Sequence, residues 1–329
     1  MDCICDAFDL QLLDDWQRDF PLVSQPFAKI AEQTGCGEAE VLNRLKALQA
    51  SGRITRVGAT CAPNTVSAST LAALAAPVET LERVAEIVGR QPGVNHSYQR
   101  ENHWNLWFVA TGPDRAHVNT VLDNIRSQTG LQVLDLPLVR PFNVDLGFKM
   151  VGDNKRPPAP KPVQLDLLQD GDRDLLQTLT SGMPLADCPY KVIADKLGWT
   201  EDDVLARISV LLDAGIITRL GVIVRHRALG WRSNAMVVWD ITSEQIDAAG
   251  PVLSAHPGIT LCYERRPVEG VWPYRLYCMI HAQSRGKALD ILTEASSLPE
   301  LGNIPYRILF SSRCFKQTGA MIAPQGAAA

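Results

Sequence analysis

One stretch of the chain, Pro92–Val109, carries side chains that can do chemistry on a bound molecule. His96, Tyr98 and Arg100 alternate within it, and alternate residues of a strand point to the same face of a sheet. A buried sheet face normally carries aliphatic residues, so a face of histidine, tyrosine and arginine predicts a ligand surface. Histidine titrates near neutrality and suits proton transfer, and arginine binds carboxylates in a bidentate fork.

An internal repeat shows which elements must position this stretch. The segment Pro21–Pro26 returns as Pro184–Pro189, and Gly52–Gly58 returns as Gly215–Gly221, both at an offset of 163 (184 minus 21). Each copy reads as helix, turn, helix and strand, which predicts a winged helix-turn-helix. An apolar periodicity of strand, helix, strand, strand, helix, strand follows each wing, and this order is ferredoxin-like.

We therefore predict an α+β protein of two tandem units, each a winged helix-turn-helix followed by a ferredoxin-like βαββαβ domain. The expected boundaries are 1–60 and 61–152 for the first unit, 153–165 for a Pro-rich linker, 166–223 and 224–318 for the second unit, and 319–329 for a flexible tail. The two ferredoxin-like domains are expected to pack sheet to sheet, as a pseudo-dimer within one chain. Further homodimerisation stays open.

Composition and charge narrow the function classes. The net charge of −4 offers no general attraction to nucleic acid or anionic membranes. The first helix-turn-helix, residues 1–60, holds nine acids against six bases, and residues 172–221 hold eight against five. DNA binding needs basic residues to face the phosphates, so the excess of acidic residues in both helix-turn-helix segments disfavours DNA binding.

Localisation and metal binding follow from the same composition. The eight cysteines form no Cys-x-x-Cys pair, which suits reduced thiols and predicts no metal site. Neither a signal-peptide pattern nor an apolar run long enough for a membrane span is present in this sequence, so we expect a cytoplasmic protein without a membrane partner.

The architecture resembles the Lrp/AsnC family of amino-acid-responsive regulators. A more specific resemblance rests on His96-x-Tyr98-x-Arg100 with Asn105-Leu-Trp107-Phe, and on the second-unit string from Trp272 through Tyr274 and Tyr277 to His281. These motifs are similar to those of the siroheme decarboxylases. The resemblance implies loss of carbon dioxide from the C12 and C18 acetates of siroheme, giving didecarboxysiroheme for haem biosynthesis. It implies no cofactor beyond this iron tetrapyrrole substrate.

Site roles follow from the resemblance and from the chemistry of the residues. We expect His96 and His103 as the acid–base pair and Arg100 as the residue that orients a carboxylate. The substrate has eight carboxylates and a planar macrocycle, so it needs cations and aromatic walls. The expected binding residues are Tyr98, Asn105, Trp107, Arg140, Lys149, Tyr263, Arg265, Tyr274, Tyr277, Arg307, Arg313 and Lys316.

Alternatives remain for several of these roles. His96 can be a structural strand residue, His103 can lie on the surface of a hairpin, and either can ligate the iron. The second unit has Leu261 at the position of His96, so we expect one competent site and one degenerate one. For the whole chain, a DNA-binding regulator and a tetrapyrrole carrier without turnover are the rival functions.

Overall fold

The computed structural model describes residues 6–147 and 161–323. These residues form two compact units in space, which differ from the two repeat units of the sequence, because each draws on both copies of the repeat. From here on, a unit is one of these spatial units, and a half is the part of the chain that holds one copy of the repeat. The first unit contains residues up to 66 and 147–230, and the second contains residues 67–146 and 231 onward. Lys149 and most of the predicted Pro-rich linker lie outside the described residues.

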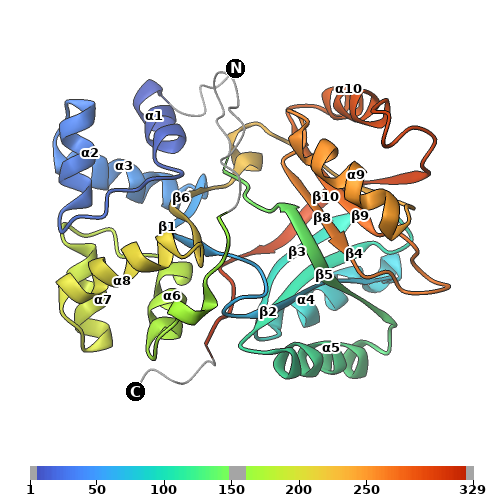
Figure 1. The fold of residues 1–329 in the computed structure, drawn as a ribbon, viewed down its shortest axis with the longest axis horizontal. Coiled ribbons are helices and arrows are strands. Elements are labelled where there is room, and N and C mark those ends of the chain that lie inside the picture. Colours follow the sequence, from blue (N-terminus) through green and yellow to red (C-terminus); the bar gives the residue numbers. More distant parts are fainter. Residues whose placement is uncertain (1–5, 148–160, 324–329) are drawn as a thin grey trace. The chain divides into compact units, whose positions relative to one another are not determined.

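The first unit contains both helix-turn-helix segments (Figure 1). Its elements are α1 (Ala7–Asp15), α2 (Pro26–Thr34), α3 (Glu38–Ala50) and β1 (Ile54–Cys61), then η2 (Leu165–Leu167), α6 (Asp172–Ser181), α7 (Pro189–Leu197), α8 (Glu201–Asp213), β6 (Ile217–Val224) and η3 (His226–Leu229). The repeated prolines explain two helix starts, because Pro26 and Pro189 occupy the first turns of α2 and α7, where no amide hydrogen is needed.

The two predicted wing strands pair with each other. β1 and β6 form an antiparallel two-stranded sheet in which the repeated glycines, Gly58 and Gly221, are directly opposite. A Cβ atom on Gly58 would lie 2.2 Å from the backbone oxygen of Leu179. Glycine is required at position 58 because the backbone of α6 packs directly against β1 and leaves no room for a side chain.

The acidic start of α8 has a local structural use. The Thr200 hydroxyl accepts from the Asp203 amide at 3.1 Å, and the Asp203 carboxylate accepts from the Thr200 hydroxyl at 2.6 Å. Glu201 accepts a hydrogen bond from Ser24 at 3.0 Å. These acids cap the helix and join the two helix-turn-helix segments.

The second unit contains both ferredoxin-like halves. The first half runs β2 (Ala68–Leu74), η1 (Val78–Thr80), α4 (Leu81–Arg90), β3 (Val94–Arg100), β4 (Leu106–Gly112), α5 (Arg115–Thr129) and β5 (Val133–Asn143), and the other half runs β7 (Ser233–Trp239), α9 (Ser243–Ala255), β8 (Leu261–Arg265), β9 (Leu276–Ala282), α10 (Arg285–Ser296) and β10 (Tyr306–Gln317). The predicted order βαββαβ is confirmed in both halves.

The two sheets join at their edges into one closed barrel, with the strand order β10-β3-β4-β2-β5-β8-β9-β7. The closing strands β5 and β10 are the longest of the barrel, with 11 and 12 residues. Each runs past its own sheet to pair with the edge strand of the other half, β5 with β8 and β10 with β3. This pairing removes the free sheet edges and builds the pseudo-dimer into one chain.

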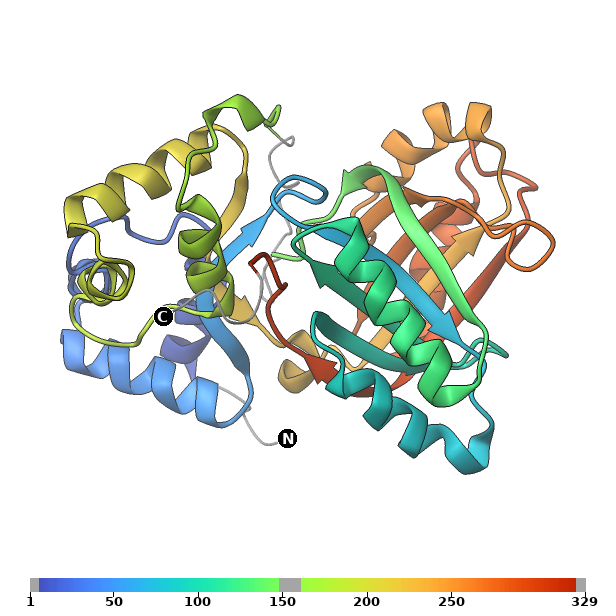
Figure 2. The ribbon, with the colours of Figure 1, turned by 90° about the horizontal axis from the view of Figure 1, so that it is seen from below.

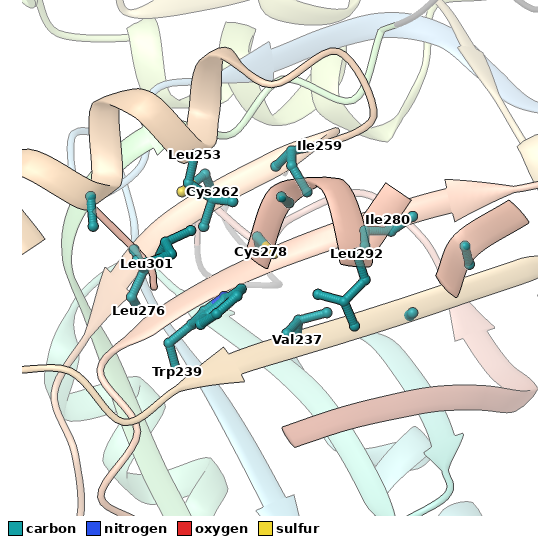
Figure 3. Packing of buried hydrophobic residues seen from close by; sticks show 14 of the residues in the cluster. Val237, Trp239, Leu253, Ile259, Cys262, Leu276, Cys278, Ile280, Leu292 and Leu301 are labelled. Carbon is teal, nitrogen blue, oxygen red and sulfur yellow. The ribbon is translucent and has the colours of Figure 1, made fainter. Parts of the chain in front are cut away.

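Apolar residues fill both sides of the barrel wall. Helices α4 and α5 lie side by side on the first half (Figures 1 and 2), over a core that includes Leu74 and Phe108. Helices α9 and α10 cover the other half, where Trp239, Cys262 and Leu292 are buried together (Figure 3). A third cluster lies on the barrel interior and is rich in aromatic rings.

The end of the described chain corrects one expectation. Residues 319–323 fall in the predicted flexible tail, yet Met321, Ile322 and Ala323 are buried, and the Met321 amide donates to the Thr111 hydroxyl at 2.9 Å. In the described part of the chain, no helix is both long enough and apolar enough to cross a membrane.

Candidate active site

His96, Tyr98 and Arg100 share one face of β3, as their alternation predicts. Tyr98 pairs with Trp107 and His96 pairs with Val109, and both partners belong to or pack against the cluster on the barrel interior. A register shift between Val94 and His96 lets Val94 face the helices while His96 faces the interior. His96, Tyr98 and Arg100 therefore all point into the barrel.

Arg100 is a buried cation, only 6% exposed. Its Nη1 donates to the Leu309 oxygen at 3.1 Å and to Asn234 Oδ1 at 3.2 Å, and its guanidinium carbon lies 5.7 Å from the centre of the Tyr98 ring. Burial lowers the pKa of Arg100 to about 10. Within the described residues no carboxylate pairs with it.

Arg265 occupies the corresponding position in the other half. Its Nη1 donates to the Leu136 oxygen at 2.7 Å, and its guanidinium carbon lies 4.6 Å from the centre of the Tyr263 ring. Burial lowers the pKa of Arg265 as well. Among the described residues this arginine also has no carboxylate partner.

Acids are kept off the interior face. The barrel strands contain two acids, Asp135 and Glu264. Asp135 accepts from Thr70 and pairs with Arg115 of α5, and Glu264 pairs with Arg140, so both acids face the helices. Among the described residues of the barrel strands, the interior face therefore carries arginines and no carboxylate.

Aromatic rings line the interior near these arginines. Trp107 lies 5.3 Å from Trp272, measured between ring centres, and the Tyr263 and Tyr277 rings stack at 5.8 Å. Trp272 Nε1 donates to the Tyr277 hydroxyl at 2.8 Å. Burial raises the pKa of Tyr277, so its hydroxyl stays protonated.

The hairpin between β8 and β9 is longer than its counterpart between β3 and β4, and its additional residues have a structural purpose. The segment between β8 and β9 forms a tight bridge between Val268 and Trp272, which turns Trp272 inward, where it is 3% exposed. Tyr274 follows, with its ring centre 4.8 Å from that of Trp272. The Tyr274 hydroxyl accepts from Arg307 Nε at 2.6 Å, so Arg307 lies beside these rings.

Other predicted site residues do not reach the interior. Arg140 pairs with Glu264 and with Asp247 of α9 on the helix side. Arg313 forms an ion pair with Glu82 of α4. Lys316 donates to the Gly89 oxygen near the end of α4 at 2.6 Å, and burial lowers its pKa. The extension of β10 past its own sheet explains these positions, because it carries Arg313 and Lys316 onto the first half.

Two residues of the β3–β4 hairpin are also removed from the interior face. His103 is exposed in the bend, with its ring centre 5.9 Å from that of Trp104. Asn105 uses both ends of its amide on the backbone of Ala76, accepting at 3.0 Å and donating at 2.8 Å. These contacts fix the hairpin against the end of β2.

His281 is an interior residue whose position the sequence analysis missed. It alternates with Tyr277 and Met279 along β9, and Asn234 is its partner on β7. Its Nε2 lies 2.7 Å from Asn234 Nδ2, and its Nδ1 lies 2.7 Å from the Thr260 hydroxyl. Burial lowers the pKa of His281 to about 4, and the nearby positive charge of Arg100 is the second, smaller cause. The period of two along β9 is a signal that could have found it.

The two histidines of the interior, His96 and His281, lie at different distances from the buried arginines. Strand pairing runs from His96 through Val109 and Leu71 to Leu136, whose oxygen accepts from Arg265. Arg100 lies about 13 Å from His96 along β3, at about 3.3 Å per residue. Of the two, His281 is linked to an arginine by hydrogen bonds, through Asn234 to Arg100.

Within residues 6–147 and 161–323, no group of three or more His, Cys, Asp or Glu side chains is arranged to hold a metal ion. The described cysteines are free thiols.

Tandem helix-turn-helix segments joined to a pair of AsnC-like domains define the class of protein. Family models match at these segments: an AsnC-like ligand binding domain at residues 66–143 and 228–316, and a siroheme decarboxylase NirDL-like HTH domain at residues 9–54 and 172–217. The chain belongs to the siroheme decarboxylase NirDL family.

Similar proteins agree with this assignment over nearly the whole length. The siroheme decarboxylase NirDL subunit of Paracoccus pantotrophus is 53% identical, and the match covers 97% of this chain and 98% of that protein. The NirD subunit of Stutzerimonas stutzeri is 46% identical over 44% of this chain and 95% of its own length. A crystal structure of siroheme decarboxylase NirDL with an iron-uroporphyrin III analogue superimposes with a TM-score of 0.67 at 25% identity, covering 95% of this chain and 93% of that one.

Proposed function

We propose that this protein is a carboxy-lyase that removes carbon dioxide from the C12 and C18 acetates of siroheme, giving didecarboxysiroheme for haem biosynthesis. The observation that carries the proposal is the charge of the barrel interior. Arg100 and Arg265 are held there by backbone or amide oxygens and by aromatic rings. Both acids of the barrel strands face the helices.

A buried cation without a counter-charge is costly, so a fold retains it where a ligand supplies the charge. The substrate meets this requirement, because it presents carboxylates around a planar macrocycle. Arg100, Arg265 and Arg307 bind carboxylates in this proposal. Tyr98, Trp107, Tyr263 and Trp272 supply faces for the ring system.

The chemical step breaks the bond between an acetate methylene carbon and its carboxylate. Carbon dioxide leaves, the electron pair stays on the methylene carbon, and one proton delivered to that carbon gives the methyl group. We assign this proton to His96, which is half-buried on the interior face. His281 is poorly suited to the role, since its low pKa keeps it neutral near pH 7.

Location and assembly complete the proposal. The enzyme works in the cytoplasm on free siroheme and needs no cofactor beyond the iron tetrapyrrole itself. Each half of the chain supplies one sheet of the barrel, so the pseudo-dimer is present in a single chain.

Anaerobic incubation of the full chain with siroheme tests the function. Mass spectrometry should show a product that has lost two carbon dioxides, and His96→Ala should keep tetrapyrrole binding while losing most turnover. Binding of siroheme without mass loss would mean a carrier. Salt-sensitive binding of promoter DNA without turnover would mean a regulator.

A further inference from the structure

We propose that His281 and Asn234 form a positioning relay that aims Arg100 at a substrate carboxylate, and that this relay makes the two halves of the barrel unequal. The inference rests on the proposed function, because it takes Arg100 as a carboxylate anchor. The inference gives His281, a histidine of the second half, a positioning role in which it does not touch the reacting carbon.

Hydrogen-bond chemistry fixes the direction of the relay. A guanidinium can only donate, so the Asn234 atom that faces Arg100 must be the amide oxygen. The Asn234 nitrogen therefore faces His281 and donates to its Nε2. Nε2 must then carry a lone pair, and the hydrogen of the neutral imidazole lies on Nδ1.

The far end of the relay agrees with this tautomer. His281 Nδ1 lies 2.7 Å from the Thr260 hydroxyl, and that hydroxyl donates to the Met279 oxygen at 3.0 Å. Thr260 therefore accepts from Nδ1–H. A pKa of about 4 for His281, caused by burial and then by the charge of Arg100, keeps the ring in this state.

The first half shows that the fold itself does not need this relay. Ser69 and Thr111 pair in β2 and β4 as Asn234 and His281 pair in β7 and β9. Thr111 donates instead to the Gly93 oxygen. Arg265, the counterpart of Arg100, has the Leu136 oxygen as the counterpart of Leu309. Small hydroxyl residues thus suffice to build the same barrel wall.

Two effects follow for Arg100. The relay holds one of its nitrogens between two fixed oxygens, which leaves the rest of the guanidinium to meet a carboxylate in a defined orientation. It also blocks rotation of the Asn234 amide, which would present its NH2 group to the cation. Loss of the acceptor at Nε2 should therefore misplace Arg100 without removing it.

Binding of iron-uroporphyrin III, followed by absorbance titration of the full chain, tests the relay without turnover. His281→Leu should weaken binding about tenfold or more, the effect expected for losing a hydrogen bond that serves a charged group. His281→Gln offers an acceptor to Asn234 and a donor to Thr260, so it should restore most of the affinity. Ser69→Ala, at the counterpart of Asn234, is the matched control and should bind as the wild type does.

Wild-type affinity in His281→Leu would overturn the relay, and so would equal weakening in His281→Leu and His281→Gln. If His281→Leu does not fold, Asn234→Ser, which installs the residue type of the first half, replaces it with the same expected weakening. Arg100→Leu separates the two proposals. Unchanged binding in Arg100→Leu would show that Arg100 is not a carboxylate anchor and would contradict the proposed function. Weak binding in Arg100→Leu together with normal binding in His281→Leu would contradict only the relay.

Discussion

The buried state of His281 makes the stability of the protein sensitive to mild acid. Burial lowers the pKa of this imidazole from its ordinary value of 6.5 to about 4 in the folded chain. The unfolded chain therefore binds more protons between these two values, and the free energy of unfolding falls as the pH falls through this window. Above pH 6.5 the histidine has no such effect.

The size of the effect follows from linkage. Between pH 7 and pH 5, this one group should lower the free energy of unfolding by about 2 kcal/mol, at 1.36 kcal/mol for each pKa unit. His281→Gln removes the titration while keeping the hydrogen-bond pattern. The other histidines are common to both proteins, so their contributions cancel in the difference.

The assay is denaturant unfolding of the wild type and of His281→Gln at pH 7 and pH 5. The wild type should lose about 2 kcal/mol more than the variant over this change in pH. Equal losses in the two proteins would show that His281 is not held neutral by burial. The tautomer argument for Asn234 would then fail as well.

Three further predictions address other parts of the structure. Arg265→Leu should weaken iron-uroporphyrin III binding about tenfold or more, while Arg313→Leu, on the helix side, should change it less than about twofold; absorbance titration compares them. Trp272→Ala should lower the free energy of unfolding by about 3–5 kcal/mol, since it empties a buried aromatic site, and denaturant unfolding measures the loss. Gly58→Ala should lower the melting temperature, because its Cβ would meet the Leu179 oxygen at 2.2 Å, and an unchanged melting temperature would contradict the close packing.

The sequence alone predicted the order of the helices and strands and one face of the candidate site. The repeat offset predicted both halves, and the alternation of His96, Tyr98 and Arg100 predicted their shared face. These features are local, since a strand's period of two and a helix's capping residues depend on neighbours in the chain. Similarity to the siroheme decarboxylases supplied the substrate.

Long-range strand pairing was beyond the same reasoning. The choice of β3 and β8 as partners for the extended closing strands depends on edges contributed by the other half. That choice carries Arg313 and Lys316 to the helix side and brings Arg100 beside Asn234 and His281. Binding roles assigned from residue type alone therefore included several cations that the fold uses for ion pairs and helix ends.

The most direct test of the account is a single-turnover anaerobic reaction with siroheme, analysed by mass spectrometry, in the wild type and in Arg100→Leu. We expect the wild type to yield a tetrapyrrole that has lost two carbon dioxides, and Arg100→Leu to leave most of the siroheme unreacted while remaining folded. Wild-type protein that binds siroheme but leaves its mass unchanged would contradict the account, and so would full turnover by Arg100→Leu.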